Sequence, residues 1–195
     1  MKLIMIYGRM NPIHEGHAKM LLQVKRRAHQ EGADFKVFLT QTKDNDKNPL
    51  GYKDKLRFLR LVVGVAPTDE GYETNNLFGL VRELSEQYSE IELVFGGDRY
   101  KTFEPLMVKY QDTFKCPVFV SNFADRDKYP YNATEMRKLA VEGNYEDFMS
   151  KCPSMFTSTQ KIQLFTLVSV GLTNTVDGRH DRKHRAARVP SESEE

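Results

Sequence analysis

The stretch GRMNPIHEGH, residues 8–17, lies between an apolar run at residues 2–7 and an amphipathic segment that closes at Gly32. A short apolar run that ends at a glycine is typical of a buried strand. The segment from about Gly16 carries apolar residues at helical spacing along one face. The sequence therefore predicts that the chain opens with a strand, a tight loop and a helix.

The same alternation continues further along the chain. Apolar runs recur at residues 35–40, 91–95 and 117–120, and helical patterns at residues 52–63, 77–84 and 98–110. Strands that alternate with helices favour parallel pairing through right-handed crossovers. We therefore expect an α/β fold, a Rossmann-like open parallel sheet of about five strands flanked by helices, with a ligand site beyond the carboxyl ends of the strands.

Domain organisation follows from changes in composition along the 195 residues. Residues 1–150 contain the alternating pattern and form the expected catalytic domain. Helical character then continues to about Leu172, so residues 151–172 are expected to be a helical extension. Residues 173–195 hold few apolar side chains and a block of basic ones, which predicts a disordered charged tail.

Charge and hydropathy exclude several classes of protein. The 29 Lys and Arg residues nearly balance 27 Asp and Glu residues, so bulk charge does not predict binding to nucleic acid or membrane. No apolar window approaches the roughly 18 residues of a membrane span, and the opening run is too short for a signal peptide. The two cysteines lack a CxxC spacing, which argues against a zinc site or a disulfide framework. We expect a cytoplasmic protein.

The loop at residues 8–17 has the composition of an anion-binding turn. Gly8 permits a tight turn, and Gly16 permits a phosphate to approach the start of a helix, where free amides and the helix dipole favour anions. His14 and His17 are three residues apart, so both imidazoles can lie on one side of the chain and donate hydrogen bonds to a phosphoryl group.

Other interpretations of the two histidines remain open at this point. They are also compatible with ordinary surface histidines at a helix start. A zinc-protease helix needs histidines four apart with a glutamate between them, whereas here the spacing is three and Gly16 intervenes. Neither the dinucleotide-binding glycine pattern nor the P-loop pattern occurs, so phosphate binding has to use another arrangement.

The two motifs together resemble the nucleotidylyltransferase superfamily. Its HxGH signature matches residues 14–17, and its S/T-x-x-R signature matches Thr134-Glu135-Met136-Arg137. GRMNPIHEGH is also similar to the opening of archaeal-type nicotinamide mononucleotide adenylyltransferases, and Asn48-Pro49-Leu50 with Lys55 is similar to a later segment of theirs. Gly96-Gly97-Asp98-Arg99, with Arg126-Asp127, looks like tailed-bacteriophage members, which would place the protein in a host cytoplasm.

The resemblance implies a reaction in which a substrate phosphate attacks the α-phosphorus of a nucleoside triphosphate. His14 and His17 would stabilise that phosphoryl centre, while Thr134 and Arg137 would hold the β- and γ-phosphates. Magnesium would arrive bound to the triphosphate, without protein metal ligands. The further nucleotide-binding residues that it implies are Gly8, Arg9, Met10, Gly16, Gly97, Asp98 and Asn132. The acceptor-binding residues that it implies are Asn48, Lys55 and Arg99.

Several positions depart from the family pattern or have a simpler explanation. Asp98 has the place to accept hydrogen bonds from ribose hydroxyls, but Asp is also common at helix starts. Asn132 and Glu135 have the spacing of an ordinary capping arrangement. Tyr131, Asn132 and Ala133 replace the usual Ile-Ser-Ser or Ile-Ser-Gly, so one phosphate-binding hydroxyl is missing. Lys55 replaces a commoner arginine and would lose bidentate geometry.

Two classes of function follow. The first is a nucleotidylyltransferase that moves AMP from ATP to a small phosphorylated acceptor, with nicotinamide mononucleotide as the first choice and cytidylyl transfer as an alternative. The second is a catalytically weak or inactive nucleotide-binding module that contributes to an assembly through its charged tail. Members of the superfamily often form homo-oligomers, but no sequence feature locates an interface.

Overall fold

The structure, a computed structural model, describes residues 1–44, 46–64, 76–123 and 131–186. For Asp98 and for residues 174–186 it describes the backbone alone. Arg126 and Asp127 therefore lie outside the described residues.

The centre of the fold is a parallel sheet with the strand order β2-β1-β3-β4. The strands are β1 (Lys2–Gly8), β2 (Asp34–Leu39), β3 (Glu90–Gly96) and β4 (Val118–Phe123). The described residues thus contain four strands, where about five were expected. The open parallel α/β architecture itself is confirmed. β1 pairs with β2 on one side and with β3 on the other, so the strand order changes direction at β1. The ligand-binding switch point therefore lies between β1 and β3.

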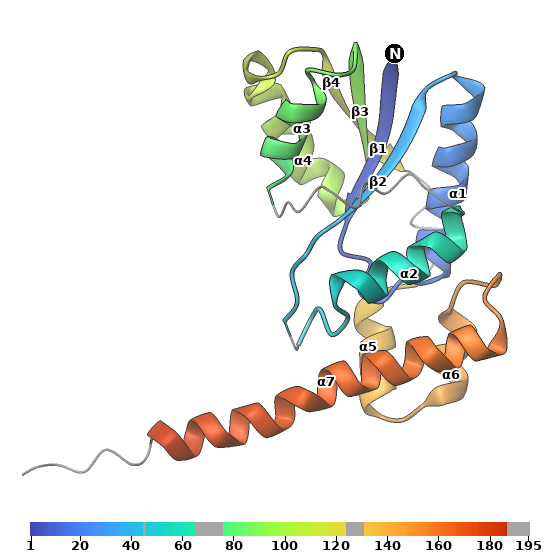
Figure 1. Cartoon of the computed structure of the whole chain (residues 1–195), viewed down its shortest axis with the longest axis vertical. Coiled ribbons are helices and arrows are strands. Elements are labelled where there is room, and N and C mark those ends of the chain that lie inside the picture. The colour runs from blue at the N-terminus through green and yellow to red at the C-terminus, as the bar shows by residue number, and fades with distance from the viewer. Residues whose placement is uncertain (45, 65–75, 124–130, 187–195) are drawn as a thin grey trace, which may run out of the picture.

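Helices cover both faces of the sheet, as the alternation of side chains in β1 requires. Ile4 and Ile6 point to the face covered by α1 (Glu15–Gln30) and α2 (Tyr52–Val63). Leu3 and Met5 point to the opposite face, which α3 (Leu77–Leu84) and α4 (Asp98–Lys109) cover. Figure 1 shows the two helical layers with the sheet between them. A short 3-10 helix, Gln111–Thr113, leads into β4.

Three helices follow the sheet and pack below the carboxyl ends of the strands (Figure 1). They are α5 (Ala133–Val141), α6 (Tyr145–Lys151) and α7 (Ser158–Ala186). Their buried residues share one core with α1 and α2, and these residues are Met136, Leu139, Ala140, Phe148, Leu164, Val168 and Leu172. This shared core brings the start of α5 to the edge of the sheet where β1 ends.

The last helix is the longest one described. The backbone of α7 is helical from Ser158 through Ala186, and the boundary expected at residue 172 stays a prediction. Leu164, Val168 and Leu172 anchor its first half in the core, and a helix that is already nucleated extends at little cost. In the described part of the chain, no helix is long and apolar enough to cross a membrane.

A buried carboxylate fastens α1 to the sheet. Glu92 of β3 is 7% exposed and accepts hydrogen bonds from Arg27 of α1 at 2.6 Å and from Ser121 of β4. Lys2 of β1 lies 3.1 Å from the same carboxylate. Burial by itself raises the pKa of Glu92, but the bonds from Ser121, Lys2 and Arg27 outweigh burial and the pKa is lowered. The cluster joins the neighbouring strands β1, β3 and β4 to the helix whose start carries His14 and His17.

Replacement of Glu92 by Gln is expected to lower the free energy of unfolding at pH 7 by about 1–3 kcal/mol, because charge-assisted hydrogen bonds to a buried group are lost. Since the pKa of Glu92 is below its ordinary value of 4.5, the contribution is present above that pH. It disappears as the pH falls through the lowered pKa, so the two proteins should converge in acid. Denaturant unfolding at several pH values measures this.

Glu90→Gln is the matched control, because Glu90 also lies beside Lys2, at 3.4 Å, but its side chain is 38% exposed. Its loss should cost less than about 0.5 kcal/mol. Equal losses for the two variants at pH 7 would contradict a specific role for the buried carboxylate.

Candidate functional site

A cavity of about 240 Å³ opens at the carboxyl ends of β1, β3 and β4. Its walls come from the loop after β1, the first turn of α1, the ends of β3 and β4, and the start of α5. It therefore lies at the switch point between β1 and β3, where an open parallel sheet binds ligands. The residues predicted from the sequence that line it are Gly8, Arg9, Met10, His14, Gly16, His17, Arg99, Asn132, Thr134 and Arg137.

His14 is the N-cap of α1. Its backbone is extended, and its Nδ1 atom accepts the backbone N–H of His17 at 3.3 Å. A nitrogen that accepts a hydrogen bond carries no proton, so the proton of the neutral ring is on Nε2. The cap therefore fixes one tautomer, in which Nε2 is a hydrogen-bond donor. His14 is 7% exposed and lines the cavity.

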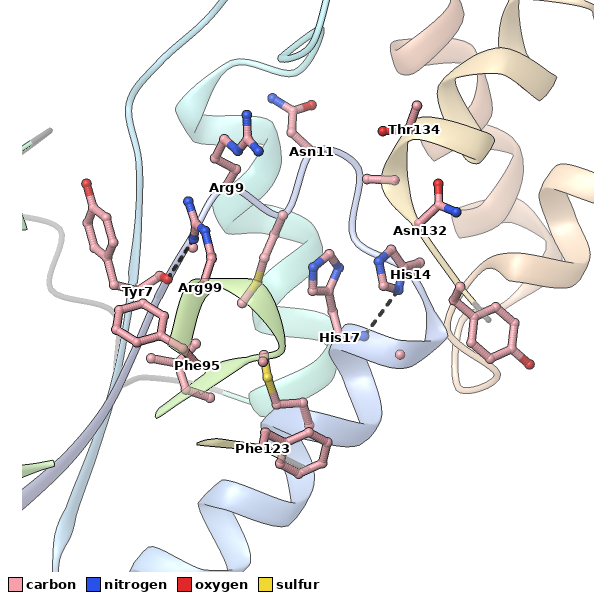
Figure 2. Close-up of a pocket in the computed structure, with 18 of the residues that line it drawn as sticks. Tyr7, Arg9, Asn11, His14, His17, Phe95, Arg99, Phe123, Asn132 and Thr134 are labelled. Carbon is pink, nitrogen blue, oxygen red and sulfur yellow. Dashed lines mark hydrogen bonds between the residues drawn. The ribbon is translucent and has the colours of Figure 1, made fainter. Parts of the chain in front are cut away.

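The two imidazoles stack on each other. Their ring centroids are 3.7 Å apart with an angle of 23° between the planes, and Figure 2 shows them side by side in the cavity wall. Gly16 makes this arrangement possible, because a Cβ there would lie 3.2 Å from Nδ1 and Cε1 of His14. The glycine predicted to let a phosphate approach thus also provides room for the ring of His14.

Arg137 reaches the same cavity from α5. Its Nη1 donates to the carbonyl oxygen of Asn11 at 2.8 Å, across 126 positions of sequence, and its Nη2 donates to Thr134 Oγ1 at 3.0 Å. Burial lowers the pKa of Arg137, and the nearby Arg9 lowers it further while Asp44 opposes this. An arginine stays protonated in proteins, so the site holds a fixed positive charge.

Asn132 is both a cap and part of the cavity wall. Its Oδ1 accepts the backbone N–H of Glu135 at 2.6 Å, so the capping arrangement considered from the sequence is present. Glu135 itself lies 2.9 Å from Lys151. The oxygen of Asn132 therefore stabilises the start of α5, whose residues Ala133 and Thr134 also line the cavity.

Positive charge dominates the cavity wall. Arg9, Lys47, Arg99 and Arg137 line it, and no Asp or Glu does so among the side chains that the structure describes. Four cations in one partly enclosed space favour a ligand with several negative charges. A second hollow of about 620 Å³ adjoins this cavity and shares Arg9, Lys47, Thr134 and Arg137 with it.

Lys47 was not predicted from the sequence, where the segment around it reads only as a polar loop. Asp44 orders the loop, because its Oδ1 accepts the backbone N–H groups of Asp46, Lys47 and Asn48 at 3.2, 2.7 and 3.1 Å. The bond from Lys47 is the main reason why the pKa of Asp44 is lowered. The Asp44 carboxylate at the start of this loop was the available signal.

An apolar part of the wall was also missed. Met20 of α1, Phe123 at the end of β4 and Tyr131 before α5 line the cavity and are partly exposed. The ring centroid of Tyr131 is 6.5 Å from that of His14. The sequence analysis singled out neither Met20 nor Phe123, because an apolar pattern does not show which residues border a cavity.

The structure places the predicted residues around α4 in different positions. Arg99 lines the cavity, and its Nη1 donates to the carbonyl oxygen of Tyr7 at 3.2 Å (Figure 2). Gly97 is not part of the wall; it precedes α4 with φ of 53°, a left-handed conformation that favours glycine. The side chain of Asp98 lies outside the described part of the chain, so its role in ribose binding stays a prediction.

Asn48 and Lys55 lie outside the cavity wall, and the acceptor-binding role that the resemblance implies for them stays a prediction. Asn48 is 2% exposed and donates to Asp44 Oδ2 at 2.6 Å. Lys55 is also 2% exposed, its Nζ donates to the carbonyl oxygen of Thr40, and burial lowers its pKa to about 8. The amphipathic α2 turns Lys55 inward, which residue type alone does not reveal because lysines are seldom buried.

A metal site built from protein ligands is not seen in the described residues, where no group of three His, Cys, Asp or Glu side chains has the right geometry.

Comparison with solved structures shows the fold again. TmcAL of Thermotoga maritima bound with alpha-thio ATP is 12% identical with a TM-score of 0.50, over 89% of this chain and 56% of that one. Its apo form has the same identity and score. A putative nicotinate-nucleotide adenylyltransferase from Vibrio parahaemolyticus is 19% identical with a TM-score of 0.48, over 87% and 96% of the two chains. This chain thus spans little more than half of TmcAL.

Comparison with sequences gives a more direct result. No curated protein matches the chain. The model of one family, described as cytidylyltransferase-like, matches residues 5–163, which include both motifs and every described residue of the cavity wall. The superfamily expected from the motifs is confirmed, and the chain belongs to the cytidylyltransferase-like family of nucleotidylyltransferases.

Proposed function

We propose that the protein is an active nucleotidylyltransferase that transfers a nucleoside monophosphate, with AMP from ATP as the first choice, to the phosphate of a small acceptor. One observation supports this above the others. Two stacked imidazoles from the start of α1 and a guanidinium from the start of α5 line the same cavity, although Arg137 is 120 positions from the nearer histidine, His17 (137 − 17).

The reaction needs positioning and charge neutralisation more than covalent chemistry. An oxygen of the acceptor phosphate attacks the α-phosphorus and forms a new P–O bond. The bond between the α-phosphorus and the bridging oxygen to the β-phosphate breaks, and pyrophosphate leaves with that electron pair. Negative charge grows on the oxygens around the α-phosphorus during this step, so hydrogen-bond donors placed there lower the barrier.

The residues of the cavity divide between the two ends of such a substrate. Nε2–H of His14 and the ring of His17 would face the α-phosphoryl oxygens. Arg137, with Thr134 and the amides at the start of α5, would hold the β- and γ-phosphates. In Figure 2 the histidines lie between Thr134 on one side and Arg99 on the other, and in this scheme Arg99 would receive the acceptor phosphate.

Magnesium enters this scheme as part of the substrate. The described residues offer no cluster of carboxylates or imidazoles for a bare divalent ion, and the cavity wall is cationic. A metal bound to the triphosphate reduces the charge that the four cations have to balance and needs no protein cage.

The proposal also names the nucleotide and the acceptor. ATP is preferred because GRMNPIHEGH is similar to the opening of the nicotinamide mononucleotide adenylyltransferases, and nicotinamide mononucleotide is the first acceptor to test on the same ground. The family description makes CTP the second nucleotide to test. The solved TmcAL structure contains alpha-thio ATP, which makes a non-hydrolysable ATP analogue a practical ligand for binding measurements.

The deciding experiment measures pyrophosphate release from ATP and from CTP with a panel of phosphorylated acceptors. Acceptor-dependent release supports the transferase. Tight nucleotide binding without release for any pair would instead support the nucleotide-binding module.

His17→Ala is expected to lower kcat for pyrophosphate release about 100-fold or more, because a hydrogen-bond donor to the transition state is lost. His17 is preferred over His14 for this test, since His14 also caps α1 and its loss destabilises the helix. His29→Ala, at an exposed position near the end of α1, is the matched control and should keep full activity. Normal turnover in His17→Ala would remove the imidazole from the mechanism.

Arg137→Ala is expected to raise the KM for the triphosphate about 10-fold or more and to lower kcat, because the guanidinium binds phosphates that carry more charge as pyrophosphate departs. Arg137→Lys should show an intermediate defect, since an ammonium cannot bond Asn11 and Thr134 as a fork. Arg82→Ala, on the exposed face of α3, serves as the control. Unchanged steady-state kinetics in Arg137→Ala would place the polyphosphate elsewhere.

A further inference from the structure

The last helix touches the loop between β2 and α2 at Gly171. A Cβ on Gly171 of α7 would lie 2.4 Å from the carbonyl oxygen of Pro49, 2.8 Å from its Cβ and 2.9 Å from its carbonyl carbon. Non-bonded atoms do not approach this closely, so a residue with a side chain does not fit here without a shift. Figure 1 shows α7 running across the end of the loop that leads to α2.

This contact differs in kind from the other close contacts of glycine. A Cβ added at Gly79 or Gly16 would lie 3.2 Å from the nearest atoms, which belong to side chains. A side chain can shift by a few tenths of an ångström to relieve such a contact. At Gly171 two of the three nearest atoms are backbone atoms of Pro49, a buried residue. A side chain at position 171 therefore has to move either α7 or the loop.

The loop at Pro49 is tied directly to the candidate site. The next residue, Leu50, donates its backbone N–H to Asn11 Oδ1 at 3.0 Å, and its carbonyl oxygen accepts from Asn11 Nδ2 at 3.0 Å. Both residues are almost completely buried. Asn11 is the residue whose carbonyl oxygen accepts the hydrogen bond from Arg137.

The position of Arg137, the donor of the hydrogen bond to Asn11, also depends on α7. Arg137 belongs to α5, and Ser169 of α7 donates its hydroxyl to the carbonyl oxygen of Ala140 in α5 at 3.4 Å. Val168 and Leu172 pack in the same core as Met136. One stretch of α7 therefore contacts both the helix that carries Arg137 and the loop that holds its acceptor Asn11.

We propose that Gly171 is a positioning residue: the close seat of α7 on Pro49 sets the position of Asn11 relative to α5 and so orients the guanidinium of Arg137 in the cavity. The structural part of this proposal is independent of the reaction. Its consequence for ligand binding rests on the proposed function, in which Arg137 holds the β- and γ-phosphates.

Gly171→Ala tests the proposal because helix propensity and the contact with Pro49 predict opposite effects on local order. In an unconstrained helix, alanine is more stable than glycine by about 1 kcal/mol. A loss of order near Pro49 in this variant therefore opposes the helix propensity and has to come from the contact. Val170→Ala is the matched control, because it changes the neighbouring residue, whose side chain is 50% exposed.

The first measurement is amide hydrogen exchange by NMR on the full chain without ligand. The N–H of Leu50 should exchange at least about 10-fold faster in Gly171→Ala than in the wild type, while that of Leu93 in β3 is unchanged and Val170→Ala matches the wild type. Leu172→Ala, which shortens the side chain that anchors the same turn of α7, should act in the same direction if Gly171→Ala does not fold. Unchanged exchange at Leu50 in a folded variant, or slower exchange, overturns the proposal.

The second measurement is calorimetric binding of inorganic pyrophosphate and of AMP. Gly171→Ala should raise the Kd for pyrophosphate about 10-fold, since misplacement by about 1 Å disturbs an oriented ion-pairing group, and leave the Kd for AMP within about twofold. Equal effects on both ligands would point to general loosening and contradict the positioning role. Absence of pyrophosphate binding to the wild type would instead refute the proposed function, and hydrogen exchange alone would then decide the role of Gly171.

Discussion

The hydrogen bond from Arg137 to the carbonyl oxygen of Asn11 holds the candidate site together. It joins the loop after the first strand to a helix that begins more than a hundred residues later. The positive charge of Arg9 repels the Arg137 guanidinium, and Lys47 and Arg99 line the same cavity. The neutral acceptors Asn11 and Thr134 orient the guanidinium without cancelling its charge. The arrangement therefore keeps its electrostatic attraction for a polyanion, and a bound polyanion would in turn relieve the repulsion.

The start of α1 combines two tasks in one residue. His14 caps the helix through Nδ1, and this bond determines which nitrogen of the ring carries the proton. The stacked ring of His17 and the missing side chain at Gly16 keep the imidazole in that orientation. The stability of the helix start and the proposed phosphoryl chemistry would thus depend on the same contacts, so a change in the cap is also a change in the wall of the cavity.

Sequence patterns located the elements well where the signal was local. The apolar runs and helical spacings indicated all four described strands and the helices that cover them, and the two motifs indicated both histidines and Arg137. They failed where burial depends on distant segments. No pattern in the sequence indicated that Lys55 is buried in the core or that Lys47, in a polar loop, lines the cavity.

Patterns among neighbouring residues were enough to predict the parallel α/β class, the superfamily and the chemical types in the site, because strand and helix periodicity, glycine turns and motif spacing are local properties. The packed fold was needed to establish that α5 faces the end of β1, that Asn11 accepts the bond from Arg137, and that Gly171 lies against Pro49. These contacts join residues far apart in the chain, and their geometry follows from how helices pack on a common core.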